Sequence, residues 1–150
     1  MFRNVGSDEE HHVALDRYIE VGARHGFALS GANFMVERFV FTGQSEAEAH
    51  ANFARTSHLF ERFHANLSAN GRFTLPPSVN GSTLAPAGPP PDAVVMGTPA
   101  MVSEALAHTL EATGARRLMV EVFSWPELEL FASEVMPRVR ATGAAHSMTG

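Results

Sequence analysis

The hydrophobic positions of this chain recur at two spacings, helical and extended, in alternating segments. A first helix is expected from Ser7, which can form a capping box with Glu10, to a stop at Gly26. One side of this helix is apolar at helical spacing, through Val13, Leu15, Tyr18, Ile19 and Ala23. The segment 32–43, ANFMVERFVFTG, is instead rich in β-branched and aromatic residues and ends in a Thr-Gly turn, which predicts a strand.

Two predicted strands are apolar on both faces. In the first, 32–43, one face carries Phe34, Val36 and Val40, and the other carries Met35, Phe39 and Phe41. The second is 116–123, RRLMVEVF. Strands of this type lie inside a parallel sheet that helices cover on both sides, so the pattern indicates an α/β protein.

Three further helices complete the pattern. Ser45 and Glu48 can open a helix that runs to about residue 67, with an aromatic stripe that we interpret as core packing (Phe53, Phe60, Phe63 and Leu67). Thr98, Pro99 and Gly114 frame the next helix as N-cap, first position and stop. Ser124 and Glu127 can open the last one, whose packing stripe is Leu128, Phe131, Val135 and Val139 and which Pro137 should kink or end.

Residues 70–97 interrupt this regular pattern with a proline-rich run. Six prolines lie between Pro76 and Pro91, and only the segment DAVVMG could add a very short strand. A connection of this length suggests a lid, an insertion or a segment that a partner orders.

Composition narrows the class of protein. The 150 residues, 45% hydrophobic with a net charge of −5, suit a single domain over 1–150 that does not bind nucleic acid, because no basic face is present. No membrane helix or signal peptide is apparent, so we expect a cytoplasmic protein. Cysteine and lysine are both absent, which excludes thiol and Schiff-base chemistry and suggests a GC-rich bacterial source.

No residue pattern identifies a catalytic group or a metal site. His11 and His12 are adjacent and therefore diverge on a helix, where we expect a solvated helix start. His50, His58 and His64 lack the spacing of helical zinc ligands. The chain has no nucleophile elbow, dinucleotide fingerprint or P-loop.

Charges in the middle of the strands are the most informative polar residues. Glu37 and Arg38 alternate faces on the first strand, and Glu121 interrupts the second. We predict that Arg38 pairs with Glu121, either as a structural ion pair or to orient a ligand, because an unpaired buried charge is costly.

Three stretches resemble the luciferase-like, flavin-dependent monooxygenases. They are FMVERFVFTGQSEAEAHANF (34–53), VMGTPAMVSEALAHTLEATGARRLMVEVF (95–123) and WPELELFASEVMPRVR (125–140). The family has a (β/α)₈ barrel, and the resemblance covers only its C-terminal portion. The implied fold is therefore part of a TIM barrel of the bacterial luciferase-like type, incomplete as a single chain.

The resemblance also implies an activity. A full-length member uses reduced FMN, supplied by a separate reductase, and O₂ to oxidise a small organic substrate. We expect this chain to need partner strands, from self-association or from a chain that supplies the missing barrel half. The alternative is a non-catalytic subunit or remnant that acts in assembly.

Candidate site residues follow from the barrel geometry, in which the chemistry gathers where strands end. Trp125 is either near the flavin or substrate, or a plug beneath the last helix. The residues expected to bind the cofactor or line the pocket are Arg38, Thr42, Gln44, Glu121, Phe123, Ser124 and Trp125.

Overall fold

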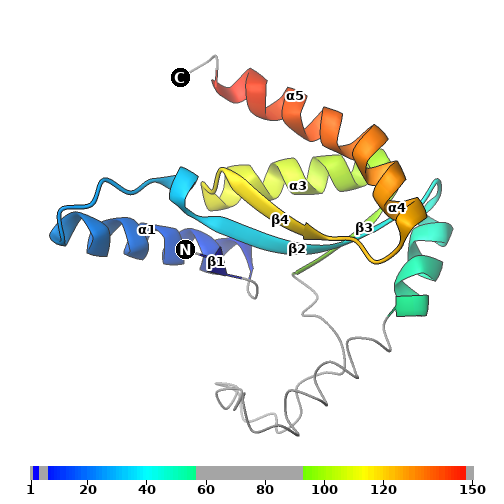
Figure 1. The fold of residues 1–150 in the computed structure, drawn as a ribbon, viewed down its shortest axis with the longest axis horizontal. Helices are drawn as coiled ribbons and strands as arrows, with labels where there is room; N and C mark the ends of the chain where they lie inside the picture. The colour runs from blue at the N-terminus through cyan, green and yellow to red at the C-terminus, as the bar shows by residue number, and fades with distance from the viewer. Residues whose placement is uncertain (1, 4–6, 57–92, 148–150) are drawn as a thin grey trace, which may run out of the picture.

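The computed structural model describes residues 2–3, 7–56 and 93–147, which form a parallel sheet with helices around it (Figure 1). The elements in chain order are β1 (Phe2–Arg3), α1 (Asp8–Arg24), the 3₁₀ turn η1 (Gly31–Asn33), β2 (Met35–Thr42), a helix described over 46–56, β3 (Val94–Gly97), α3 (Pro99–Thr113), β4 (Arg117–Glu121), α4 (Trp125–Leu130), the π-helical turn η3 (Phe131–Val135) and α5 (Met136–Ser147).

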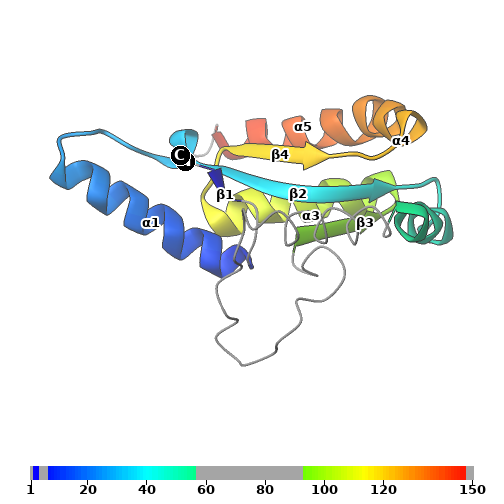
Figure 2. The ribbon, with the colours of Figure 1, turned by 60° about the horizontal axis from the view of Figure 1, so that its bottom comes forward.

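β2 is the central strand of the sheet. β4 pairs with it in parallel from Met35 opposite Arg117 to Phe39 opposite Glu121. β1 and β3 pair in parallel with the other edge of β2, at its start and its end respectively. Figure 2 shows β4 and β3 on either side of β2. The sheet order within the described residues is therefore β4, β2, then β3 with β1.

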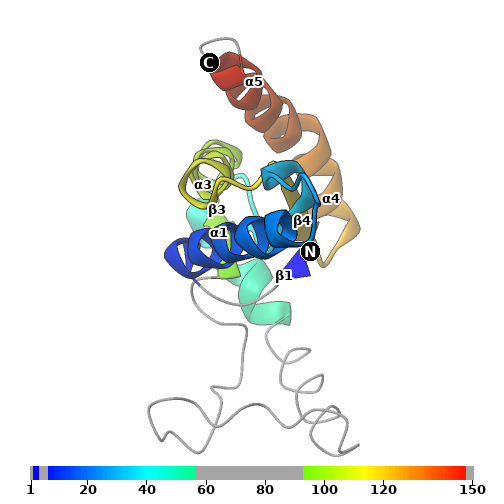
Figure 3. The same ribbon diagram turned by 90° about the vertical axis from the view of Figure 1, so that its left-hand side faces the viewer.

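One face of the sheet carries the hydrophobic core. Val40 and Val95 pack there with Val102 and Leu106 of α3 and with residues of η3, and Leu118 and Val120 of β4 lie against the same cluster. Nearer the start of β2, α1 packs Leu15 against Phe34 and Val36. Figures 1 and 3 show α3 and α5 on the same side of the sheet. This is the face predicted to carry Phe34, Val36 and Val40.

The capping residues set most helix boundaries as predicted. Ser7 and Glu10 form the complete capping box of α1. The Glu48 N–H donates to the Ser45 hydroxyl at 3.2 Å, at the start of the helix 46–56. Gly114 ends α3 in the left-handed conformation, with φ of 71°, which glycine adopts without strain. Thr98 occupies the N-cap of α3, but its side chain makes no capping hydrogen bond.

Pro137, which was expected to kink or end the last helix, does not end it. The helix continues through Pro137 into α5, and the π-helical turn η3 lies just before it. A proline in a helix removes one backbone hydrogen bond and crowds the carbonyl four residues earlier, here that of Ser133 within η3, and a wider turn relieves this conflict. Leu128, predicted to pack, is 41% exposed, whereas Phe131 and Val135 are buried.

One other expectation is wrong in this structure, and one is confirmed. His11, expected in a solvated helix start, is fully buried, and its Nδ1 lies 2.6 Å from the Ser7 carbonyl oxygen, whereas His12 is exposed. The predicted loop 70–97 ends in β3, which is the short strand suggested by DAVVMG. Residues 57–92, including Phe60, Phe63, Leu67, His58 and His64, lie outside the described residues. No helix in the described ranges is long and apolar enough to cross a membrane.

Candidate functional site

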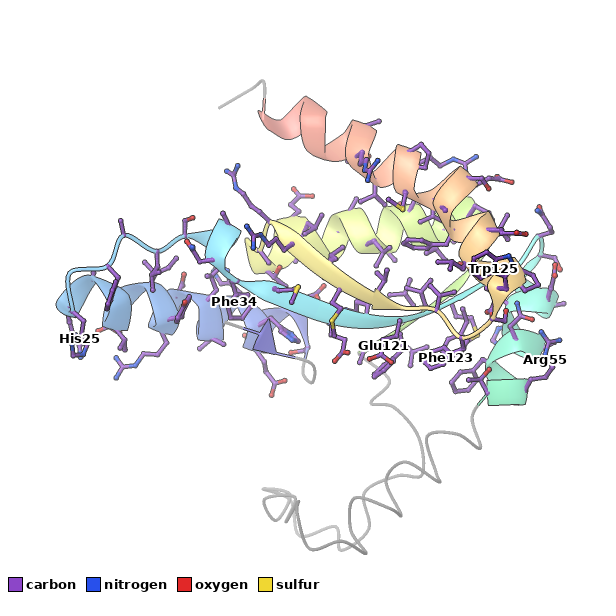
Figure 4. All side chains as sticks on the ribbon, viewed as in Figure 1. His25, Phe34, Arg55, Glu121, Phe123 and Trp125 are labelled. Atoms are coloured by element: carbon purple, nitrogen blue, oxygen red, sulfur yellow. The ribbon has the colours of Figure 1, made fainter. Side chains whose placement is uncertain are left out.

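The sheet face opposite α3 carries the polar and aromatic side chains that are candidates for chemistry. Side chains alternate along a strand, so the odd-numbered residues of β2 share this face with their partners on β4. We call it the aromatic–carboxyl face, and its members are Met35, Glu37, Phe39, Phe41, Met119, Glu121 and Phe123. Figure 4 shows Glu121 and Phe123 on the side of the sheet away from α5.

A carboxyl pair lies at the middle of this face. Glu37 is opposite Met119, so Glu121 is its diagonal neighbour on β4, and the two side chains share a hydrogen bond. Glu37 is only 3% exposed. Its burial, followed by the hydrogen bond and the charge of Glu121, raises the pKa of Glu37 from 4.5 to about 7. The pair can therefore hold or release a proton near neutral pH.

Phenylalanine rings cover the face beside the carboxyl pair. The Phe123 ring stacks on Phe41, with centroids 5.1 Å apart and an interplanar angle of 7°, and lies 6.2 Å from the Phe39 ring. Phe53, from the helix 46–56, meets Phe41 edge to face at 5.0 Å. These rings form an aromatic cluster in which Phe41 is fully buried and Phe39, Phe53 and Phe123 are partly exposed.

Arg38 does not belong to this face. It lies opposite Val120 in the register, on the helix-covered side, and is 1% exposed. Its Nη2 atom is 2.5 Å from Oδ1 of Asp8, at the start of α1, and Nη1 donates to the Glu37 carbonyl oxygen at 2.7 Å. The predicted pair of Arg38 with Glu121 is therefore wrong, because neighbours offset by one residue point to opposite faces.

The remaining predicted site residues divide between helix caps and the core. Thr42 is buried on the core face, and its carbonyl oxygen accepts from the Asn52 side chain at 2.9 Å. Gln44 is exposed, and its N–H donates to Glu48 at 2.8 Å. Ser124 is the N-cap of α4 and donates to the Glu127 carboxylate at 2.6 Å.

Trp125 is 70% exposed, and its indole N–H donates to Glu129 at 2.7 Å. The interpretation of Trp125 as a plug beneath the last helix is therefore wrong. Figure 4 places it on α4, beyond Phe123.

The structure thus brings Glu121 and Phe123 together and leaves the other five predicted residues off the aromatic–carboxyl face. Sequence reasoning omitted Glu37, Phe39 and Phe41 from the predicted site. The signal that could have selected them is spacing, because each lies an even number of residues from the others and alternation puts them on one face. Among the described residues, no group of three or more histidine and carboxylate side chains could hold a metal ion.

Comparison with known proteins finds likeness in structure but not in sequence. No protein-family model matches the chain, and no curated protein matches it. The monooxygenase RslO1 from Streptomyces bottropensis matches 91% of the chain with a TM-score of 0.63 at 16% identity. The EDTA monooxygenase EmoA from Chelativorans sp. BNC1 matches 95% with a TM-score of 0.62 at 15% identity.

A third similar structure has a bound flavin. It is the oxygenating constituent of 3,6-diketocamphane monooxygenase from Pseudomonas putida, a type II Baeyer–Villiger monooxygenase in complex with FMN, which matches 92% of the chain with a TM-score of 0.55 at 17% identity. The chain spans 40% of RslO1 and 42% of each of the other two chains. The fold therefore corresponds to part of the barrel fold of these monooxygenases, in agreement with the partial barrel that the sequence resemblance implied.

Proposed function

We propose that this chain forms part of a flavin-dependent monooxygenase that uses reduced FMN and O₂ to oxidise a small organic substrate. The observation that supports the proposal most strongly is the shared fold, since nearly the whole chain superimposes on part of three monooxygenases, one of them in complex with FMN. The aromatic–carboxyl face is the proposed contribution of this chain to the active site.

This face fits one half of FMN. Phe39 and Phe123 are partly exposed aromatic rings against which a flavin ring could stack, and the carboxyl pair can exchange hydrogen bonds with ring nitrogens and oxygens. The face offers no comparable site for the phosphate of FMN. The only cationic side chain that β2 and β4 place in register with this face is Arg117, which lies at the far end from Phe123. We infer that other segments bind the phosphate.

The residues of the face have separate roles in this proposal. Phe39 and Phe123 position the ring and exclude water from it, and Glu37 with Glu121 holds a proton within reach of the bound ring. Bound reduced FMN would supply the activation of O₂, and a separate reductase would reduce it. We propose that the protein acts in the cytoplasm.

Partner strands complete the pocket in this proposal, from a second copy or from another polypeptide segment. A second candidate function is a non-catalytic role in assembly. It is favoured by β4, whose residues are largely apolar yet all partly or fully exposed, while the only strand that pairs with it among the described residues is β2.

Titration of FMN into the purified chain tests the proposal, with riboflavin as the matched ligand that lacks the phosphate. Flavin fluorescence and absorbance report binding, and sedimentation of the same sample reports the mass. Saturable binding of both flavins with similar dissociation constants would support a ring-binding face. If neither flavin saturates, the result would contradict flavin binding by this chain or its own dimer and would favour the assembly role.

A further inference from the structure

The outer edge of β4 is an unpaired strand edge within the described residues. β4 pairs with β2 on one side, and the described part of the chain adds no strand to its other side. Its residues alternate between faces that are both apolar in the middle, yet Leu118, Met119 and Val120 all stay partly exposed. An edge of this kind is a template for another strand, because no strand among the described residues pairs with its outward N–H and C=O groups.

The sequence of β4 is complementary to itself when reversed. It reads Arg-Leu-Met-Val-Glu, from Arg117 to Glu121, with opposite charges at its ends and Met119 at its centre. Two copies laid antiparallel about Met119 place Arg117 of each opposite Glu121 of the other. Leu118 then faces Val120, and Met119 faces its own copy. β3, the strand at the other end of the sheet order, has no such pattern, as it reads Val-Val-Met-Gly.

Among the described residues, the charges near β4 also lack a counter-ion. None of the ion pairs formed by the described residues includes Glu37, Glu121 or Arg117. In the antiparallel arrangement, Arg117 of the second copy reaches the carboxyl pair from across the edge, on the same face. Opposite charges directly across an antiparallel pair stabilise it, and like charges destabilise it.

We propose that β4 pairs antiparallel with β4 of a second copy of this chain, about a twofold axis at Met119, so that two sheets become one continuous sheet. Such an interface is isologous, because the same strand serves on both sides and closes the assembly at two copies. The proposal requires no flavin, so its tests are made without flavin and are independent of the proposed activity.

Charge reversal tests the pairing. Arg117→Glu and Glu121→Arg each place like charges opposite one another twice, so each variant alone should weaken the dimer about tenfold or more. An equimolar mixture of the two variants restores both opposite-charge contacts and should regain the dimer mass in sedimentation. Arg116→Glu, one residue before β4 and exposed, is the matched control and should leave the mass unchanged.

Cross-linking tests the register. The chain has no cysteine, so Met119→Cys introduces a single thiol at the proposed axis. Antiparallel partners have Cα atoms about 4.5–5.5 Å apart, within the range that a disulfide spans. Oxidation should therefore link Met119→Cys into covalent dimers, whereas Met101→Cys, exposed on α3, should keep the non-covalent dimer but form no covalent link.

Two results would overturn the proposal. One is a parent chain of monomer mass at concentrations where the cross-link is tested. The other is a dimer mass that neither charge reversal changes, together with a Met119→Cys variant that cross-links no faster than Met101→Cys. That result would place the dimer contact elsewhere. Circular dichroism of each variant separates a lost dimer from a lost fold.

Discussion

Arg38 shows how a single buried charge ties two elements together. Its guanidinium is almost fully buried and pairs with Asp8, whose other oxygen lies 3.4 Å from His108 of α3. Asp8→Ala leaves Arg38 buried without its carboxylate, so the free energy of unfolding should fall by about 2 kcal/mol, less than for a fully buried pair because Asp8 is partly exposed.

Urea denaturation measures this effect, and Asp16→Ala on the exposed side of α1 is the control. The double variant Asp8→Ala with Arg38→Met should regain most of the loss, since it removes both charges. If Asp8→Ala is as stable as the parent chain, the pair of Asp8 and Arg38 does not hold α1 to the sheet.

Glu37 should make stability depend on pH. Its pKa is raised from 4.5 to about 7 in the folded chain, so between these values the folded chain keeps a proton that the unfolded chain releases. The contribution of Glu37 to the free energy of unfolding is therefore largest below pH 4.5. It falls by about 3 kcal/mol as the pH rises to 7.

Denaturation of the dilute, monomeric chain at pH 5 and pH 8 measures this difference. Glu37→Gln should remove most of it, and Glu104→Gln, on an exposed site of α3, should not. An unchanged pH dependence in Glu37→Gln would assign the effect to another group. In the proposed dimer the dependence should shrink, because Arg117 of the second copy favours the ionised pair.

At the scale of residues, the sequence predicted the strand face on which each side chain lies, but not the residues that it contacts. Alternation correctly separated Phe34, Val36 and Val40 from Met35, Phe39 and Phe41. It could not give the register between β2 and β4, and a shift of one residue decides whether Glu121 meets Arg38 or Glu37. The partner of Arg38 lies 30 residues away on α1, a separation that no local pattern records.

At the scale of elements, η1 fixes the entry to β4. The Arg116 N–H donates to the Gly31 carbonyl oxygen at 3.0 Å, and a Cβ on Gly31 would lie inside van der Waals contact with the Gly114 carbonyl oxygen. The Gly31 and Gly114 atoms that would clash belong to the backbone, so they cannot move apart without shifting the end of α3. Gly31→Ala should therefore lower the free energy of unfolding by about 2 kcal/mol.

Thermal denaturation of Gly31→Ala beside Ala28→Ser, an exposed position in the preceding segment, measures the cost. An unchanged melting temperature in Gly31→Ala would mean that the junction has room. Sequence reasoning placed strands and caps well here because each depends on neighbouring residues. It missed the π-helical turn before Pro137, because widening one turn is a compromise between the proline and the packing of Phe131 and Val135.

At the scale of the whole molecule, the chain has the fold of part of a longer monooxygenase chain, of which it spans about 40% in RslO1. The order of capping residues and apolar strands carried that resemblance, although overall identity to each of these structures is below 20%. The candidate site was harder to predict. Of the residues predicted at strand ends, Thr42 is buried in the core and Ser124 caps a helix, and only Phe123 lies on the aromatic–carboxyl face, most of which runs along the strands.

The central claim is that the aromatic–carboxyl face binds the flavin ring, and FMN titration of three matched proteins tests it most directly. They are the parent chain, Phe123→Ala and Phe27→Ala, the last removing a ring that is 64% exposed. The account predicts saturable binding by the parent and by Phe27→Ala, and about tenfold weaker binding by Phe123→Ala, because the stacked ring is lost. Equal affinity in all three proteins, or no saturation by the parent, would contradict it.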